Sequence, residues 1–311
     1  MMGQIHQLIL THGHEEARRL AGTDERRYVD LAAAFMSADL TGIGTTYTGF
    51  CMMGLPHKAL GDSEPWERKG PRITLLIEPG HLYENGERKL YGVPYGSRAR
   101  LILIYLQTQA MRTNCPEIEL GRSMREWMER MGVQTGGKNY RDVREQANRI
   151  SACTLSFHWG RSKDHAPGFR KDNIVEGGIQ LYDQGDDDQH RLWVDTVRLS
   201  DKFFAELKNH HAPLVEAAIR QISNQSLAID IYTWLAFRLH SLETDTPITW
   251  AALHGQFGAG YKLLRQFRSR FLESLKAALA VYPEARISVT EQGLTLAPSP
   301  PPVRPKITAL A

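Results

Sequence analysis

The sequence contains little cysteine, no long apolar run and no strong excess of either charge. Its three cysteines, Cys51, Cys115 and Cys153, are far apart, which argues against a disulfide framework and against a zinc ribbon. No stretch approaches the ~20 apolar residues of a membrane-spanning helix, and the first residues lack the basic and apolar regions of a signal peptide. We therefore expect a soluble, cytoplasmic protein that does not bind membranes.

The chain has 311 residues, 42% of them hydrophobic, which is enough for two domains with apolar cores. A net charge of +3 does not identify a partner, so the placement of the basic residues matters more than their sum. Residues 1–27 are polar and charged and are expected to form a flexible N-terminal arm. Residues 298–311 begin with a proline-rich stretch and are expected to form a tail.

One order of elements is predicted twice between these ends. The first copy has helices at 98–111, 123–132 and 138–153 and strand-like runs at 154–160, 177–183 and 191–199. The second copy has helices at 226–242, 249–258 and 260–282 and a β-hairpin at 285–297. This is the order of a winged helix-turn-helix. We predict an α+β fold of two tandem winged helix-turn-helix domains with short β-hairpin wings, at residues 28–199 and 200–297.

The segment GVQTGGKNY at 132–140 has the spacing of a phosphate-binding loop, but Asn139 stands where such a loop needs Ser or Thr to hold magnesium. A true phosphate-binding loop also follows directly after a buried β-strand. This segment instead follows an amphipathic helix, for which Ser123 is the expected N-cap and Glu126 the capping-box residue. The glycines are better explained as the turn between two helices, with Gly132 in a left-handed cap.

Other enzyme signatures are also weak. His210 and His211 are adjacent, so on a strand they would point to opposite faces, which does not suit the metal site of a strand-nicking enzyme. The aspartates between 183 and 188 lack the glycine and distal glutamate of a calcium loop and are interpreted as a polar turn. We predict no catalytic site, no metal and no cofactor. ATP turnover or a covalent protein–DNA adduct would reveal the alternative, an ATPase or a nickase.

The helix at 138–153 has one apolar face and one basic face. Tyr140, Val143, Ala147 and Ile150 cluster toward the expected core. The predicted DNA-binding residues of this helix are Lys138, Arg141, Asn148 and Arg149 on the outward face and Arg144 at its flank. Arginine and asparagine suit guanine and adenine edges. A solvated charged face, stabilised by pairs with nearby acidic side chains, explains the same pattern, so both interpretations stay open.

The helix at 260–282 has the clearer pattern, with five basic residues and one acidic residue between 261 and 276. A helix that needs only solubility usually mixes the two signs more evenly. Its predicted base-reading residues are Lys262, Arg265, Gln266 and Ser269, with Arg268 and Arg270 at the flanks. Arg161 and Lys163, in a loop between strands, lie where a wing would touch phosphates, although a solvated loop fits equally well.

Five stretches together resemble RepA-type plasmid replication initiators: TGFCMMGLPHKAL (48–60), YGVPYGSRARLILIYLQTQA (91–110), ELGRSMREWMERMGVQTGGK (119–138), IDIYTWLAFRLH (229–240) and WAALHGQFGAGYKLLRQFRSRF (250–271). The resemblance implies tandem winged-helix domains that bind direct repeats, called iterons, in duplex DNA at a plasmid origin. It also implies melting of a nearby AT-rich region, recruitment of the host helicase and replisome, and in some members repression of the protein's own gene and control of copy number.

The resemblance further implies that the second long helix is the main base reader. The first domain would then contact phosphates, a partner subunit in a homodimer, or both. A winged-helix transcriptional regulator that binds a palindromic operator is the alternative with the same fold, because a two-fold dimer matches a palindrome. A preference for binding direct repeats, rather than a palindrome, would favour the replication initiator over the transcriptional regulator.

Overall fold

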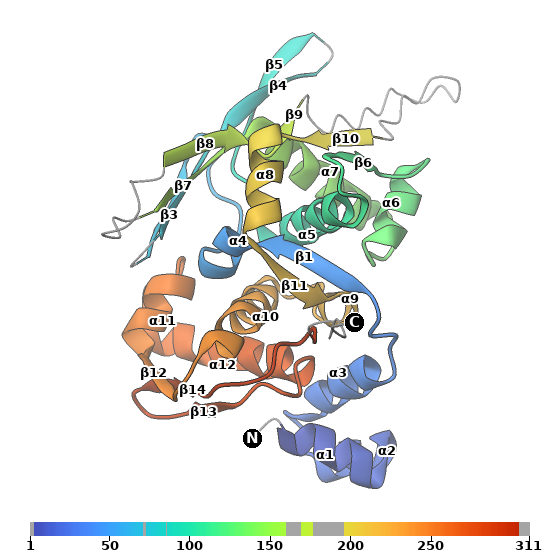
Figure 1. The fold of residues 1–311 in the computed structure, drawn as a ribbon, viewed down its shortest axis with the longest axis vertical. Coiled ribbons are helices and arrows are strands. Elements are labelled where there is room, and N and C mark those ends of the chain that lie inside the picture. The colour runs from blue at the N-terminus through green and yellow to red at the C-terminus, as the bar shows by residue number, and fades with distance from the viewer. Residues whose placement is uncertain (1–2, 71–72, 85, 160–168, 177–195, 305–311) are drawn as a thin grey trace, which may run out of the picture. The chain divides into compact units, whose positions relative to one another are not determined.

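The structure is a computed structural model that describes residues 3–70, 73–84, 86–159, 169–176 and 196–304 (Figure 1). Over these residues the fold is mixed α/β, with helices and small antiparallel sheets. The chain divides into two compact units. Unit 1 contains residues 1–44, 212–222 and 227–311, and unit 2 contains residues 45–211 and 223–226.

This division differs from the predicted boundaries at residues 28 and 200, because the two ends of the chain share one core. The predicted flexible arm is wrong for residues 3–20, which form two helices of unit 1. Ile5 is buried, and the Nε2 atom of the buried His6 lies 2.9 Å from the carbonyl oxygen of Ala280. These contacts link residues 274 positions apart, so no local pattern could indicate them.

Unit 1 contains three N-terminal helices and a C-terminal group of helices and strands (Figure 1). The elements are α1 (Gly3–His12), α2 (His14–Leu20), α3 (Arg26–Met36), α9 (Glu216–Gln221), α10 (Ser226–Arg238), the 3-10 helix η1 (Leu239–Ser241), β12 (Thr246–Thr249), α11 (Trp250–Phe257), α12 (Leu264–Ala280), β13 (Ile287–Val289) and β14 (Gly293–Leu296). The helices and hairpin predicted between 226 and 297 are thus confirmed.

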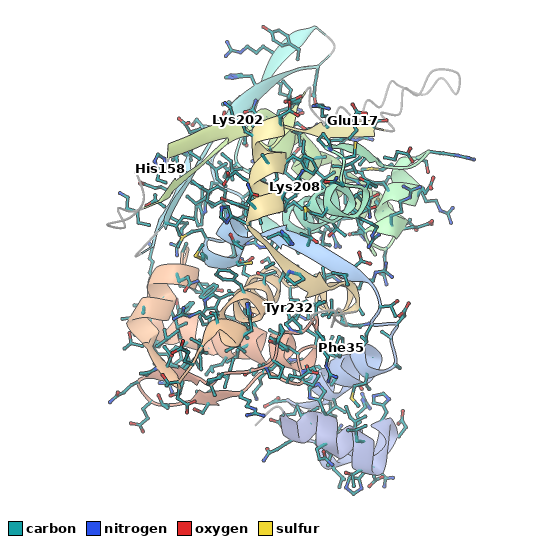
Figure 2. All side chains as sticks on the ribbon, viewed as in Figure 1. Phe35, Glu117, His158, Lys202, Lys208 and Tyr232 are labelled. Atoms are coloured by element: carbon teal, nitrogen blue, oxygen red, sulfur yellow. The ribbon has the colours of Figure 1, made fainter. Side chains whose placement is uncertain are left out.

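The core of unit 1 is built on α10 and α12. Tyr232 of α10, labelled in Figure 2, has a fully buried side chain whose hydroxyl accepts a hydrogen bond from the backbone N–H of Val215 at 3.1 Å. Burial raises the pKa of Tyr232, so its hydroxyl stays protonated. Helix α3 packs against α12, and its Tyr28 hydroxyl donates to the carbonyl oxygen of Glu273 at 3.1 Å. The N-terminal helices therefore support the C-terminal half of α12.

Unit 2 is organised around α5, an apolar helix whose Ile102 and Leu106 are fully buried. The elements are α4 (Thr48–Met52), β2 (Trp66–Lys69), β3 (Ile73–Glu78), β4 (Gly80–Glu84), β5 (Glu87–Tyr91), α5 (Gly96–Thr113), β6 (Glu117–Glu119), α6 (Met124–Arg130), α7 (Gly137–Ala152), β7 (Thr154–Trp159), β8 (Phe169–Asn173), β9 (Val175–Glu176), β10 (Thr196–Leu199) and α8 (Asp201–Asn209). Strands β1 (Ile43–Tyr47) and β11 (His211–Val215) each contain a position at which the chain passes between the units, and residues 223–226 return briefly to unit 2.

Among the described residues, unit 2 has three sheets. Strands β2, β3, β7 and β8 form one antiparallel sheet in that order, and β4 and β5 form a separate hairpin. In β3 the side chains of Ile73, Leu75 and Ile77 alternate toward the core, as expected for a sheet buried on one face. The third sheet has the order β6-β10-β9.

The strand order β6-β10-β9 matches the order β12-β14-β13 in unit 1. In each case the strand before the short helix pairs antiparallel with the last strand. That last strand also pairs antiparallel with the strand before it among the described residues. Each unit thus places a short helix and a longer helix beside a three-stranded sheet of the same order.

Candidate nucleic-acid interface

The second helix pair, α11 and α12, is joined by a turn that the sequence specifies locally. Thr249 is the N-cap of α11, because its hydroxyl accepts a backbone N–H hydrogen bond at 3.2 Å. Gly258 ends α11, and Gly260 has a φ of 89°, a conformation that favours glycine. The ring of His254 holds the turn, since its Nε2 atom lies 2.9 Å from the carbonyl oxygen of Tyr261.

Buried aromatic rings determine which side of α12 faces the core. Phe267 and Phe271 are fully buried, and their ring centroids are 5.3 Å apart. The Phe271 ring also lies 6.0 Å from Trp250 and 5.6 Å from Phe257, both on α11. Because these rings interlock, α12 has one defined rotation about its axis, and the side opposite the phenylalanines is exposed to solvent.

That exposed side carries three of the four residues predicted to read bases, Arg265, Gln266 and Ser269. Lys262 was predicted to lie on the same helix, but it precedes the first helical residue, Leu264. We define the α12 outer surface as Lys262, Arg265, Gln266 and Ser269, all of which are exposed. Within the described ranges, neither Lys262 nor Arg265 has an acidic partner at ion-pair distance. These four exposed residues thus lie on or just before the first half of α12, and two of them carry positive charges with no acidic partner among the described residues.

The two flanking arginines of α12 have partners within the protein. The guanidinium of Arg268 lies 4.9 Å from the ring centroid of Trp250, a cation–π contact, and Arg270 forms an ion pair with Glu273 at 3.1 Å. Trp250 was not identified as part of this region from the sequence, because its contact with Arg268 depends on how α11 packs on α12. These contacts hold both arginines beside the α12 outer surface.

The first helix pair, α6 and α7, begins with the predicted N-cap. The Ser123 hydroxyl accepts from the backbone N–H of Glu126 at 3.2 Å, and the Glu126 carboxylate accepts from the backbone N–H of Arg122 at 2.8 Å. Hydrogen bonds from Arg122 and Arg130 lower the pKa of Glu126. Gly132 has the left-handed φ of 70° that was predicted. The glycine-rich segment follows helix α6 rather than a strand, unlike a phosphate-binding loop.

The basic face of α7 is exposed only in its first half. Lys138 and Arg141 are exposed, and neither has an acidic partner at ion-pair distance among the residues with described positions. Arg144, one turn further along, is half-buried. The accessible part of this face is thus a short basic segment near the start of the helix.

The predicted outward position of Asn148 and Arg149 is wrong, because both side chains are buried, with 8% and 7% exposed. Arg149 forms ion pairs with Glu145 at 2.6 Å and Asp62 at 2.8 Å. Its guanidinium also donates to the carbonyl oxygen of Val93 at 3.3 Å. These hydrogen bonds satisfy the buried charge, so Arg149 supports the fold of unit 2 and cannot reach a ligand in solvent.

The β4–β5 hairpin covers the second half of α7, and β4 and β5 both contact this helix. Asn148 donates to Glu84 and to the Tyr91 hydroxyl, each at 3.1 Å, and Tyr91 also hydrogen-bonds Glu84. Burial and the neighbouring Glu84 raise the pKa of Tyr91, which keeps the Tyr91 hydroxyl protonated. The Asn-Gly dipeptide at 85–86 is a sequence signal for such a hairpin, but it does not indicate which helix the hairpin covers.

Two predicted contacts, Arg161 and Lys163, lie outside the described residues, as do the aspartates between 183 and 188. Elsewhere in the chain, no group of three or more His, Cys, Asp and Glu side chains is arranged to hold a metal ion. None of the helices whose positions are described is long and apolar enough to cross a membrane.

Comparison with known proteins identifies one family for this chain and a solved structure with a similar fold. The family model for plasmid encoded RepA proteins matches residues 93–251, just over half of the chain. A search of curated proteins found no match. A crystal structure of domains 2 and 3 of RctB is similar with a TM-score of 0.50 and 13% identity, covering 78% of this chain and 93% of that one. A second RctB structure of domains 2–3 has a TM-score of 0.43 and 15% identity, covering 71% and 79%.

Proposed function

Because the chain belongs to the family of plasmid-encoded RepA proteins, we propose that it initiates plasmid replication by binding directly repeated duplex sites at the origin. Bound copies would promote melting of nearby DNA and recruit the host helicase and replisome. The proposed role involves no catalytic step by the protein itself. Control of copy number and repression of its own gene would follow from the same binding.

The α12 outer surface is the observation that carries this proposal. Arg265, Gln266 and Ser269 on helix α12, with Lys262 just before it, present cationic, amide and hydroxyl groups, which is the chemistry that reads base edges in the major groove. Arg268 and Arg270, held at the flanks, would contact phosphates. The first turn of α12 has no side-chain cap among the described residues, so its backbone amides can also bind a phosphate.

We further propose that each helix pair and its three-stranded sheet form a winged helix. The matching strand orders support this assignment, as does the position of α12 after a glycine turn. In unit 1 the β13–β14 hairpin would be the wing. In unit 2 Lys138, Arg141 and Arg144, together with the loop residues Arg161 and Lys163, would contact phosphates. Unit 2 is also where we place a homodimer contact.

A footprint on the DNA that flanks the protein's own gene tests the proposal. The full chain should protect several direct repeats at physiological salt, where non-specific ionic binding is weak. The Arg265→Ala variant should lose this protection at the same concentration, whereas Arg149→Ala should retain it once folded. Protection of one palindrome instead would identify a transcriptional regulator. ATP turnover or a covalent adduct with DNA would replace the proposal with an enzyme.

A further inference from the structure

Unit 1 contains a groove of about 390 Å³ that does not include the α12 outer surface. Its walls come from α1, the segment after α2, the second half of α12 and strand β13. Apolar side chains form most of the lining, including Leu8, Leu272 and Ile287. Two further lining residues, Leu20 and Val289, are 55% and 42% exposed. Large apolar side chains gathered in an open groove are typical of a binding surface.

The charged residues of this groove do not suit a charged ligand. The ionisable residues that line it are Glu25 and Lys276, and they pair with each other at 3.5 Å. The groove therefore offers little net charge to a phosphate or to nucleic acid, in contrast to the α12 outer surface. An apolar ligand fits the lining better than a charged one does.

Strand β13 adds backbone groups to the groove. It pairs with β14 on one side, and no described strand pairs with its other side. The carbonyl oxygen of Arg286 accepts from Ala297 at 2.9 Å, and the N–H of Thr290 donates to Gly293 at 2.9 Å. Because hydrogen-bonded positions alternate along an antiparallel pair, the N–H and C=O groups of the two groove-lining residues Ile287 and Val289 point toward the open edge.

We propose that this groove binds an extended apolar segment of a partner protein, which adds a strand to β13. The open strand edge selects an extended backbone, because a helix has no free N–H and C=O groups along its side. Alternate side chains of an added strand point to one face, so every second residue of the segment would enter the groove. A segment that alternates apolar and polar residues meets both requirements.

The groove and the α12 outer surface use different halves of the same helix. Leu272, Leu275 and Leu279 line the groove, whereas Arg265 and Ser269 lie on the exposed side of the first half. Binding in the groove therefore leaves the α12 outer surface accessible, and the proposed peptide site does not depend on DNA binding. Residues of α1 and from the end of α2 onward form one wall of the groove. The N-terminal helices of unit 1 are therefore required for the site.

A titration of the ¹⁵N-labelled full chain with a capped peptide of alternating valine and threonine, with a lysine at each end, tests the proposal. We expect the amide signals of Ile287 and Val289 to shift and their hydrogen exchange to slow. Leu20→Asp should weaken binding about tenfold, because it replaces an apolar contact by a charge. Leu10→Asp is the matched control, since Leu10 is 70% exposed and does not line the groove.

Several outcomes would overturn the proposal. Equal peptide affinity of Leu20→Asp and Leu10→Asp would show that the groove is not the site. Unchanged binding of a peptide methylated at alternate backbone nitrogens, in either register, would show that no strand is added. Much tighter binding by a chain that ends at Arg304 would mean that the protein's own end competes for the groove. A dimer that dissociates in Leu20→Asp would identify a second copy as the occupant.

The DNA footprint separates this proposal from the proposed function. Leu20→Asp should protect the same DNA sites as the unchanged chain, while Arg265→Ala should bind the peptide normally. Thermal melting of both aspartate variants checks that they fold, and the exposure of Leu10 and Leu20 predicts only small changes.

Discussion

Helices α7 and α12 each follow a short helix and a glycine-containing turn, but they differ in how much of the polar side is covered by other elements. On α7, the β4–β5 hairpin encloses Asn148, and Arg149 is buried in ion pairs. On α12, Arg265 and Gln266 are exposed to solvent. The same order of elements therefore produces one helix with a short accessible basic segment and one whose polar residues Arg265, Gln266 and Ser269 are all exposed.

This difference shows that the polar side of a helix is defined by its three-dimensional neighbours. A periodicity argument finds the apolar stripe of α7 correctly, because Val143, Ala147 and Ile150 are fully buried. It cannot distinguish water from a polar partner on the opposite side. The hairpin that supplies this partner lies about 60 residues earlier in the chain, between Gly80 and Tyr91. The comparison favours α12 over α7 as the reader of bases.

The largest expected effect comes from removing the ring that orients α12. Phe271→Ala should lower the free energy of unfolding by about 3–5 kcal/mol, because it leaves a cavity among packed aromatic rings. Val143→Ala, at the corresponding buried face of α7, removes fewer atoms and should cost less. Urea denaturation of both variants measures the difference. A larger loss in Val143→Ala would mean that α7, rather than α12, is the more tightly anchored helix.

The next largest effect is on stability, and it distinguishes the buried Arg149 from the exposed arginines of α7 and α12. Arg149→Ala should lower the free energy of unfolding by about 2–3 kcal/mol, because Glu145 and Asp62 lose their charged partner. Its affinity for DNA should not change when the variant is folded. A loss of DNA affinity without a loss of stability would contradict the buried, structural role of Arg149.

DNA binding should distinguish the exposed residues of the two helices. Arg265→Ala should weaken binding to the protected sites by about 1–3 kcal/mol and reduce discrimination at one base pair. Arg141→Ala should weaken binding to all sequences similarly. It should also reduce the slope of the logarithm of the binding constant against the logarithm of the salt concentration by about one, because one phosphate contact is lost. Fluorescence anisotropy at two or more salt concentrations measures both. The roles of the helices would be exchanged if Arg141→Ala altered sequence preference and Arg265→Ala did not.

The smallest effect concerns the caps of the two short helices. Glu126 at α6 has a lowered pKa, so its stabilising effect is complete above the pKa of an unfolded glutamate and is lost as the pH falls through the lower folded value. Thr249 at α11 does not titrate. On lowering the pH, the hydrogen-exchange protection factor of the Arg122 amide, which donates to the Glu126 carboxylate, should therefore fall before that of the Ala252 amide, which donates to Thr249. Glu126→Gln, which keeps an acceptor but no charge, should remove this pH dependence.

Local sequence signals predict the central elements of both units well. Ser123 and Gly132 mark the ends of α6, and the spacing of Phe267 and Phe271 identifies the buried side of α12. These features depend on residues within a few turns of one another. The hairpin predicted at 285–297 is likewise confirmed as β13 and β14.

The elements that sequence reasoning missed depend on distant partners. The polar composition of the first 27 residues suggested a flexible arm, yet Ile5 and Ala17 are buried in unit 1. The helices in this segment are stabilised through contacts such as the one between His6 and Ala280, which are 274 positions apart. Short helices gain most of their stability from such packing. The local pattern of a single sequence cannot predict a packing partner that lies so far away in the chain.

The shared core of the two chain ends has a consequence for synthesis on the ribosome. Helix α3, whose Val29, Ala32 and Phe35 are buried in the folded chain, is translated early, but the α12 residues that it packs against are translated much later. At about 5–20 residues per second, the delay between Tyr28 and Glu273 is roughly 12–50 seconds. Unit 2 can fold within that interval, because residues 45–211 are already complete. A polypeptide that ends before α12 would thus leave the side of α3 that packs against α12 exposed, and exposed apolar side chains make a chain a substrate for chaperones and proteases.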